Sequence, residues 1–167
     1  DKALWLHDWI IDNCEYDGTY RHAQAYDLFV FGTGTCEAYH AAYMDLLRRV
    51  GIECGRVSDR GHVWTLAKLD GEWCHIDTTG ETASGKDVLL GELSRHKLFG
   101  LNDSIIVAKL VGEDPENGIR FKDPNVEATS LKNNYIVRTG KIHQYSDAYR
   151  DDVQACLDQG KSSFDLT

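Results

Sequence analysis

Residues that break or divide a chain are scarce in this sequence. Only two prolines occur among its 167 residues, and both lie in one polar stretch, at Pro115 and Pro124. No low-complexity tract, internal repeat or Pro/Ser-rich linker is present. A chain of this length usually forms one domain that buries about two-thirds of the surface exposed by its unfolded form. We therefore expect a single domain over 1–167, with its core at about 1–80 and an extension of the same domain at about 81–167.

Long apolar runs and an excess of basic residues are also absent. No apolar run reaches the length that a bilayer requires. Lysine and arginine number 18 against 27 aspartate and glutamate residues, which gives a net charge of -9. An acidic surface repels phosphate backbones and anionic lipid headgroups alike. We expect no nucleic-acid partner and no membrane span.

Paired cysteine motifs are missing as well. The five cysteines contain no C-x-x-C pair and are dispersed along the chain, at Cys14, Cys36, Cys54, Cys74 and Cys156. This spacing argues against a structural zinc site and against a small disulfide framework. Five histidines lack the spacing that is typical of metal ligands: His7, His22, His40, His96 and His143. We expect no metal and no cofactor.

Hydrophobic periodicity predicts both helices and strands. An amphipathic helix opens the chain and is expected to end near 16–18. Residues 19–31 are interpreted as irregular and aromatic-rich, and 87–111 fit either type of element. The pattern at 134–143 predicts a strand and a turn, and Ser146 fits the cap of a later short helix.

A stronger helix signal begins at Cys36. Thr35 is a suitable N-cap, and Gly51 is a ready stop. Apolar residues recur between them at helical spacing, at Tyr39, Tyr43, Leu46, Leu47 and Val50. In the first turn of a helix, unsatisfied N–H groups and the helix dipole favour a thiolate, which is the reactive form of cysteine. A free cysteine is nevertheless most often a small buried hydrophobe, so helix position alone does not make Cys36 a nucleophile.

Two alternating runs joined by Asp-Gly at 70–71 predict a β-hairpin. With a two-residue turn, Leu69 pairs with Glu72 and the rest of the register follows. His62 and Asp77 then lie on the same face as diagonal cross-strand neighbours, about 7–8 Å apart between their α-carbons. A change of one residue in the loop length would send Asp77 to the opposite face.

This hairpin geometry is suited to acid–base chemistry. A carboxylate bonded to one imidazole nitrogen fixes the tautomer and leaves the other nitrogen to exchange a proton with a nucleophile. His62 with Asp77 is the favoured pair. His75 lies on the same face and is a second candidate, ranked lower because it pairs nearer the turn. The tryptophans of this face, Trp64 and Trp73, are interpreted as a hydrophobic wall that excludes water, with core packing as the default for both.

Three motifs occur in order along the chain: GTCEAY at 34–39, GHVW at 61–64 and LDGEWCHIDTT at 69–79. Together they resemble the transglutaminase-like superfamily, especially its bacterial members. The resemblance covers about residues 1–80. It implies an α+β, papain-like fold, in which a helix that carries the nucleophile packs on an antiparallel sheet.

The resemblance also implies roles for individual residues. Cys36 would be the nucleophile, His62 the general base and then acid, and Asp77 the orienting carboxylate. Ala38 and Val63 differ from the residues usual at these motif positions. Because neither change removes a catalytic atom, we expect them to affect the shape of the pocket and hence the substrate.

The reaction expected of this triad is acyl transfer on amide bonds through a thioester, with peptide or amide hydrolysis favoured. Two alternatives stay open: transfer of a glutamine acyl group to an amine, and a non-catalytic module that binds peptide or glycan on the same scaffold. The oxyanion needs preorganised donors. The backbone N–H of Cys36 is one, and Gln24 and Tyr26 are candidates for another, although Tyr26 is more simply interpreted as a core aromatic.

Partners and location are predicted only in outline. We expect a peptide or protein substrate, with cell-wall peptide as one option. The chain starts at Asp1 rather than Met, so we expect it to be part of a larger protein. An extracellular or cell-envelope location is favoured, although these residues carry no signal that identifies the compartment.

Overall fold

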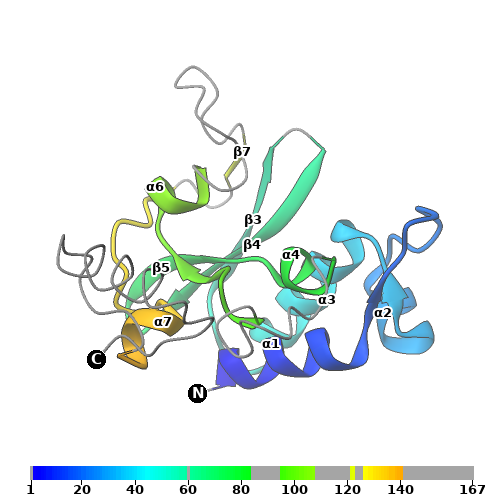
Figure 1. The fold of residues 1–167 in the computed structure, drawn as a ribbon, viewed down its shortest axis with the longest axis horizontal. Helices are drawn as coiled ribbons and strands as arrows, with labels where there is room; N and C mark the ends of the chain where they lie inside the picture. Colours follow the sequence, from blue (N-terminus) through cyan, green and yellow to red (C-terminus); the bar gives the residue numbers. More distant parts are fainter. Residues whose placement is uncertain (1, 60, 84–94, 108–120, 123–125, 141–167) are drawn as a thin grey trace, which may run out of the picture.

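The computed structural model describes residues 2–59, 61–83, 95–107, 121–122 and 126–140. Its elements occur in the order α1 (Lys2–Asn13), β1 (Glu15–Tyr16), α2 (Ala25–Phe31), β2 (Thr33–Gly34), α3 (Cys36–Arg49), β3 (Cys54–Asp59), β4 (His62–Leu69), β5 (Glu72–Ile76), α4 (Thr78–Ala83), β6 (Phe99–Leu101), α6 (Asp103–Ile106), β7 (Phe121–Lys122) and α7 (Tyr135–Arg138) (Figure 1). None of the described helices is long and apolar enough to cross a bilayer. The helix expected after Ser146 lies outside the described residues.

Five strands form an antiparallel sheet in the order β6-β5-β4-β3-β7. The three middle strands, β3, β4 and β5, are consecutive hairpins, and β6 and β7 pair with their outer edges. A separate parallel pair joins β1 to β2. The middle of the sheet is therefore built from contacts that are local in sequence, which is why the sequence pattern predicts the hairpin.

The helix that begins at Cys36 packs between α1 and the sheet (Figure 1). Its residues Tyr39, Tyr43 and Leu47 are completely buried, in a core shared with α1, β4 and β5. Burying a side chain such as Leu47 stabilises the fold by about 2 kcal/mol. The Tyr43 hydroxyl donates to the carbonyl of Ala3 at 2.9 Å, which fixes α1 to α3. The predicted α+β fold, with this helix on an antiparallel sheet, is confirmed.

The opposite face of the sheet carries a second core. Successive side chains of a strand point to opposite faces, so Trp64 and Leu66 of β4 lie on one face and Thr65 and Ala67 on the other. Leu66 packs with Ile106 of α6 in this second core, whereas Ala67 belongs to the core under α3. Both faces of the central strand are therefore covered.

The segment 19–31 is not irregular throughout, because it contains α2. The carboxylate of Asp27 accepts a hydrogen bond from the backbone N–H of Gln24 at 3.1 Å, and Gly32 ends the helix in a left-handed conformation at φ 67°. Such caps stabilise a short helix that has little hydrophobic periodicity. The first helix ends at Asn13, earlier than predicted.

The strand expected at 134–143 is also wrong for the residues up to 140, which are described. Asn134 is the N-cap of α7, and its side-chain oxygen accepts from the N–H of Val137 at 3.2 Å. The other end of the same amide donates to the carbonyl of Phe99 at 3.0 Å. A tertiary contact therefore holds Asn134 in place and overrides the β-branched composition of the segment.

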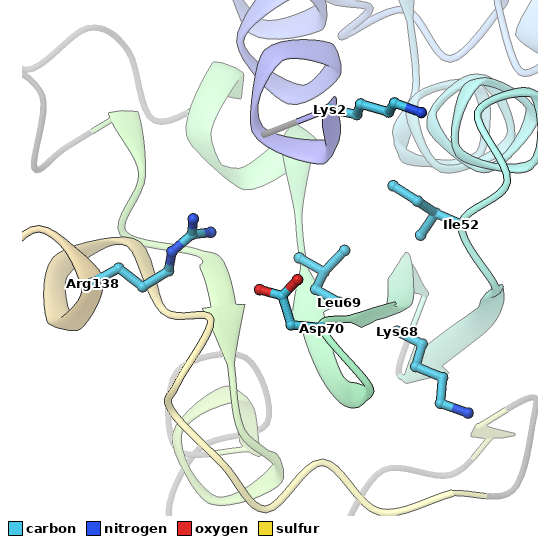
Figure 2. Close-up of a pocket in the computed structure, with 6 residues that line it drawn as sticks. All are labelled: Lys2, Ile52, Lys68, Leu69, Asp70 and Arg138. Atoms are coloured by element: carbon cyan, nitrogen blue, oxygen red, sulfur yellow. The ribbon is translucent and has the colours of Figure 1, made fainter.

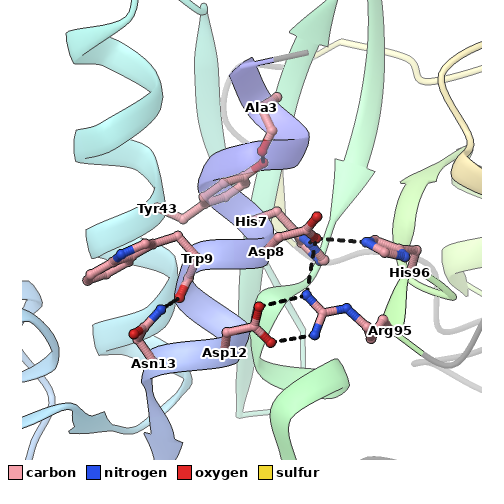
Figure 3. A network of polar contacts seen from close by, with 9 residues as sticks. All are labelled: Ala3, His7, Asp8, Trp9, Asp12, Asn13, Tyr43, Arg95 and His96. Atoms are coloured by element: carbon pink, nitrogen blue, oxygen red, sulfur yellow. Dashed lines mark hydrogen bonds and ion pairs between the residues drawn. The ribbon is translucent and has the colours of Figure 1, made fainter. Parts of the chain in front are cut away.

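A buried pair of histidines fixes the segment around residue 96 to α1 (Figure 3). One oxygen of Asp8 accepts from His7 Nδ1 at 2.9 Å and from His96 Nε2 at 2.7 Å. Burial opposes ionisation, but the two histidine hydrogen bonds hold the pKa of Asp8 well below its usual range. These three side chains could in principle offer ligand atoms to a metal. The guanidinium of Arg95, which pairs with Asp12, already lies 3.9 Å from the same Asp8 oxygen, so a cation is in place.

His40 gives the fold a predicted weakness in mild acid. It is 5% exposed, and burial lowers its pKa to about 4. The unfolded chain takes up this proton near pH 6.5, so the folded state loses stability as pH falls from about 6.5 to 4. We expect His40→Asn, which can keep the hydrogen bond to Thr65, to remove about 2 kcal/mol of the stability difference between pH 7 and pH 5. Urea unfolding at both pH values measures this, and an identical pH dependence in the two proteins would contradict it.

Candidate active site

Cys36 occupies the first turn of α3, as predicted. Thr35 is its N-cap, with extended backbone, and the N–H of Thr35 donates to the carbonyl of His22 at 2.8 Å. Position 34 has no room for a side chain, because a Cβ on Gly34 would lie 2.6 Å from the Cβ of Ala38. The backbone before Cys36 is therefore held tightly against α3, and the thiol is left half-buried at the start of the helix.

The hairpin has the predicted register, with Leu69 opposite Glu72. As a result, the first residue of β4 and the residue after β5 meet on one face. His62 Nε2 lies 2.9 Å from Asp77 Oδ2. Asp77 is 1% exposed, whereas 30% of the His62 side chain is exposed. The carboxylate of Asp77 is thus buried, and the imidazole of His62 is partly exposed at the surface.

Both carboxylate oxygens of Asp77 are occupied. While Oδ2 accepts from His62, Oδ1 accepts from the backbone N–H groups of Thr79 at 3.0 Å and Gly80 at 3.2 Å. The N–H of Asp77 itself donates to the carbonyl of Leu98 at 3.2 Å. The start of α4 therefore fixes the carboxylate in one orientation, and the carboxylate fixes the imidazole.

The electrostatics of the site favour a thiolate–imidazolium pair. Burial lowers the pKa of His62, but the hydrogen bonds and negative charges of Asp77 and Cys36 outweigh it and raise that pKa to about 10. The hydrogen bond from His62 lowers the pKa of Cys36 against the opposing effect of burial, and the N–H groups of Val63 and Glu37 lower it further. Because Asp77 takes Nε2, Nδ1 is the nitrogen left for the sulfur. A thiolate held in this way is the nucleophilic form of cysteine.

Comparison with known proteins agrees with this geometry. Residues 1–78, which carry all three side chains, match the model of the transglutaminase-like superfamily. This part of the chain is therefore similar to the transglutaminase-like superfamily. The α+β fold, with a helix packed on an antiparallel sheet, is the arrangement that the resemblance implied. No curated protein matches the chain.

Two solved structures are similar to part of the chain. A candidate cysteine protease from Cytophaga hutchinsonii shares 24% identity at a TM-score of 0.40, over 46% of this chain and 30% of that one. A TGase shares 14% identity at a TM-score of 0.44, over 50% of this chain and 27% of that one. The chain thus spans less than a third of the length of either structure.

The two side chains considered as oxyanion donors lie at the start of α2. Gln24 is the N-cap of this helix. Tyr26 is 66% exposed. Its ring meets the ring of Phe31 edge-on, with 6.2 Å between the centroids. Tyr26 is therefore not the core aromatic that the sequence suggested. A donor role for either residue stays a prediction.

Trp64 does not line an open cleft. It is 1% exposed, and its ring stacks on His62 with centroids 5.7 Å apart. Core packing, the default interpretation, is therefore correct for Trp64, and Trp73 packs partly buried against the same core. His75 is completely buried and bonds Trp64 and Asp103. These contacts leave His62, not His75, beside Asp77.

Sequence reasoning missed a loop built around Asp17. Its Oδ1 accepts from the N–H of Thr19 at 2.8 Å, and its Oδ2 accepts from the N–H groups of Arg21 at 2.8 Å and His22 at 2.9 Å. Since the His22 carbonyl receives the N–H of Thr35, this loop is anchored beside the start of α3. The Asp-Gly-Thr sequence here is an Asx-turn signal that could have revealed it.

Two tyrosines join this loop to the site. Tyr16 pairs with Gly34 across the β1–β2 ladder, and its pKa is raised first by burial and then by the charge of Cys36. The ring of Tyr20 meets the Tyr16 ring edge-on at 6.4 Å. Tyr20 is 74% exposed and has φ 58°, a conformation that is uncommon outside glycine. Tyr16 therefore lies near the thiol and Tyr20 lies beside Tyr16, and nothing in the sequence pattern signalled either contact.

A pocket of about 410 Å³ lies away from these residues (Figure 2). Its lining residues surround the hairpin turn and are Lys2, Ile52, Lys68, Leu69, Asp70 and Arg138. The turn is at one end of the eight-residue strand β4, and His62 is at the other. A strand of that length spans roughly 25 Å, so this pocket does not serve the chemistry of Cys36.

Gly80 offers a test of how tightly the carboxylate must be held. A Cβ at this position would lie 2.5 Å from Leu98 Cδ1 and 2.9 Å from Asp77 Oδ2, the oxygen that holds His62. We expect Gly80→Ala to displace that oxygen and slow the alkylation of Cys36 at pH 6 by about tenfold. The matched control is Gly18→Ala, where a Cβ meets nothing within 4 Å. Equal alkylation rates in the two variants would contradict the prediction.

Proposed function

We propose that this protein catalyses acyl transfer on amide bonds, with Cys36 as nucleophile and water as the principal acceptor. One observation carries the proposal: the His62 ring bonds Asp77 through Nε2 at 2.9 Å, and the same ring lies near enough to Cys36 to lower the pKa of its thiol. That order of contacts is what a nucleophile, a general base and an orienting carboxylate require. The family match over residues 1–78 supports the same class of chemistry.

The proposed reaction begins with attack of the Cys36 thiolate on an amide carbonyl, which forms a C–S bond and a tetrahedral oxyanion. The oxyanion collapses, the C–N bond breaks, and His62 gives its proton to the departing amine. Water then adds to the thioester while His62 accepts its proton. The C–S bond breaks, which releases a carboxylic acid and restores the thiolate–imidazolium pair.

The oxyanion would form at the N-terminus of α3. The backbone N–H of Cys36 is the first donor we propose, because it belongs to the unsatisfied N–H groups of the first helical turn. The N–H of Glu37, at the same helix start, lowers the pKa of the Cys36 thiol in the resting site. The helix dipole adds a favourable field for both the thiolate and the oxyanion.

Water is favoured as the acceptor because the reacting groups are not enclosed. Cys36 is half-buried, and 30% of the His62 side chain is exposed. A thioester formed there would be open to hydrolysis unless an amine bound in its place. The substrate class we propose is a peptide or protein amide, with cell-wall peptides among those to be tried first.

We also propose that the described residues beyond 80 belong to the same domain as the site. The carbonyl of Leu98 receives the N–H of Asp77 at 3.2 Å. Farther along the chain, Asn133 Nδ2 donates to the carbonyl of Leu69 at 2.7 Å. Both contacts join the later segments to the hairpin that carries the histidine and the aspartate.

The test of the proposal compares wild type with Cys36→Ala. Both proteins are incubated with a panel of peptides, proteins and cell-wall peptide fragments, with and without a labelled primary amine, and the products are identified by mass. We expect hydrolysed amides with wild type and none with Cys36→Ala. Label incorporation in place of hydrolysis would make the protein an amine transferase. Cys54→Ala is the matched control, because Cys54 is also half-buried but burial raises its pKa.

Identical product spectra from wild type and Cys36→Ala would contradict the enzyme proposal for these substrates. In that case a retained affinity for one of the peptides or glycans would favour a binding module on the same scaffold.

A further inference from the structure

A second hydrogen-bonded chain lies directly behind His62, and the proposed reaction does not use it. The indole of Trp64 stacks on the imidazole of His62, with 23° between the ring planes. On its other side, the same indole bonds His75, and His75 bonds Asp103. Trp64 is 1% exposed and His75 is completely buried. The contacts therefore form one buried path from a carboxylate to the face of the proposed catalytic imidazole.

The direction of this chain follows from the donors and acceptors. The Nε1 of an indole can only donate, so His75 Nδ1 accepts from Trp64, at 2.9 Å. A neutral His75 then carries its proton on Nε2 and donates it to Asp103 Oδ1, at 2.7 Å. Each hydrogen bond thus points toward the carboxylate, and each polarises the next group in the chain.

Asp103 is firmly placed at the end of this chain. Its Oδ2 accepts from the N–H of Ala128 at 3.0 Å, and its own N–H donates to the carbonyl of Ala128 at 2.7 Å. It is the first residue of α6, whose N-cap Asn102 accepts from the N–H of Ile105 at 3.0 Å. The carboxylate therefore cannot move without breaking its hydrogen bond from Ala128.

We infer that Asp103 and His75 are positioning residues, which hold the Trp64 indole against His62 in an orientation that stabilises the imidazolium. This inference rests on the proposed function, because it concerns the same thiolate–imidazolium pair. An aromatic face attracts a cation that lies over it. An indole whose N–H is bonded to a chain ending in a carboxylate is richer in electron density, which strengthens that attraction.

The carboxylate at the end of this chain belongs to a segment outside the family match. Asp103 lies beyond residues 1–78, yet it acts on His62 through two buried rings. Among the described residues, the charged groups that face His62 include the thiol of Cys36 on α3, the carboxylate of Asp77 after β5, and Asp59 at the paired position on β3. All three stay unchanged in the variants below, so a shift in the titration of the pair reports on the chain behind the ring.

The experiment follows the ring protons of His62 by NMR from pH 5 to pH 11 in wild type, Asp103→Asn, Trp64→Phe and the double variant, and it measures iodoacetamide alkylation of Cys36 at pH 6 in wild type and His62→Ala. Asn at 103 removes the charge and keeps the size. Phe at 64 keeps an aromatic ring over His62 and removes the N–H that His75 accepts. Thermal melts confirm that each variant is folded. If Asp103→Asn does not fold, Trp64→Phe still tests the inference, because it removes the N–H that joins the indole to His75.

We expect the pKa of the His62 imidazolium to fall by about 0.5 in Asp103→Asn, which is a roughly threefold increase in its acid dissociation constant. Trp64→Phe should give a similar shift. In the Trp64→Phe background, the Asp103→Asn change should add almost nothing, because its effect passes through the indole N–H. A purely structural role for Asp103 would not vanish in that background.

Two results would overturn the inference, and they are distinguishable from one another. If wild-type Cys36 is alkylated rapidly at pH 6 in a His62-dependent way and Asp103→Asn leaves the titration of His62 unchanged, the positioning role is wrong and the proposed function stands. If wild-type Cys36 shows no acid-shifted alkylation, the ion pair does not exist, and the proposed function fails together with the inference.

Discussion

Asp77→Asn is expected to reduce amide turnover almost as severely as Asp77→Ala, by about a thousandfold or more. The reason is the number of acceptors that the site needs. One oxygen of Asp77 receives His62 Nε2–H at 2.9 Å, and the other receives the N–H groups of Thr79 and Gly80. An asparagine side chain has only one acceptor, so its NH₂ group must face either the two backbone donors or the imidazole N–H.

The measurement is kcat/KM on the amide substrate identified by the product assay, for wild type, Asp77→Asn and Asp77→Ala. Asp45→Asn serves as the control, because Asp45 is an exposed partner of Arg49 on the outer side of α3. Retention of more than a tenth of wild-type activity by Asp77→Asn would contradict the account, since one neutral acceptor would then suffice to orient His62.

Gly100→Ala is expected to produce the largest loss of stability in the described part of the chain, about 4 kcal/mol or more. Gly100 has φ +76°, and a Cβ there would lie 2.1 Å from the carbonyl oxygen of Asn133. That atom belongs to the backbone, so the 133–134 segment would have to move away from β6. The movement would break the hydrogen bond from Asn134 to Phe99.

Urea unfolding of wild type, Gly100→Ala and Gly140→Ala tests this prediction. Gly140 also has a positive φ, +65°, but a Cβ there meets nothing within 4 Å. Gly140→Ala should therefore cost only the backbone term, about 1 kcal/mol. Similar losses in the two variants would show that the contact between β6 and Asn133 does not constrain the fold.

The contact between His62 and Asp77 and the helix start at Cys36 could be predicted from the sequence because each depends on local rules. The Asp-Gly turn at 70–71 fixes the hairpin register, and the register alone brings His62 and Asp77 to one face. The helix start at Cys36 follows from the N-cap and the helical spacing of apolar residues. No long-range contact has to be known for either conclusion.

The missed features depend on contacts between segments far apart in sequence, or on caps. α7 forms because Asn134 is held by Phe99, a partner 35 residues away. The role of Trp64 could not be inferred either, because its indole N–H bonds His75 only when both rings are buried under α6. A residue pattern predicts that such side chains are buried, but not which polar partner they meet.

Asp103 shows the same limit at the boundary of the family match. The motifs end near residue 79, and the sequence beyond it offered no register or cap from which a contact with His75 could be computed. The bond between them spans 28 residues. Contacts of this kind are specified by the packing of the whole sheet rather than by any local signal.

The central claim is that His62 holds Cys36 as a thiolate, and the most direct measurement is the pH dependence of cysteine alkylation. Wild type and His62→Ala are treated with iodoacetamide from pH 5 to pH 9, and each labelled cysteine is identified by peptide mass. The account predicts that Cys36 reacts at pH 6 much faster than Cys54 and that His62→Ala abolishes this difference. Slow labelling of Cys36 and Cys54 at equal rates in wild type would contradict it.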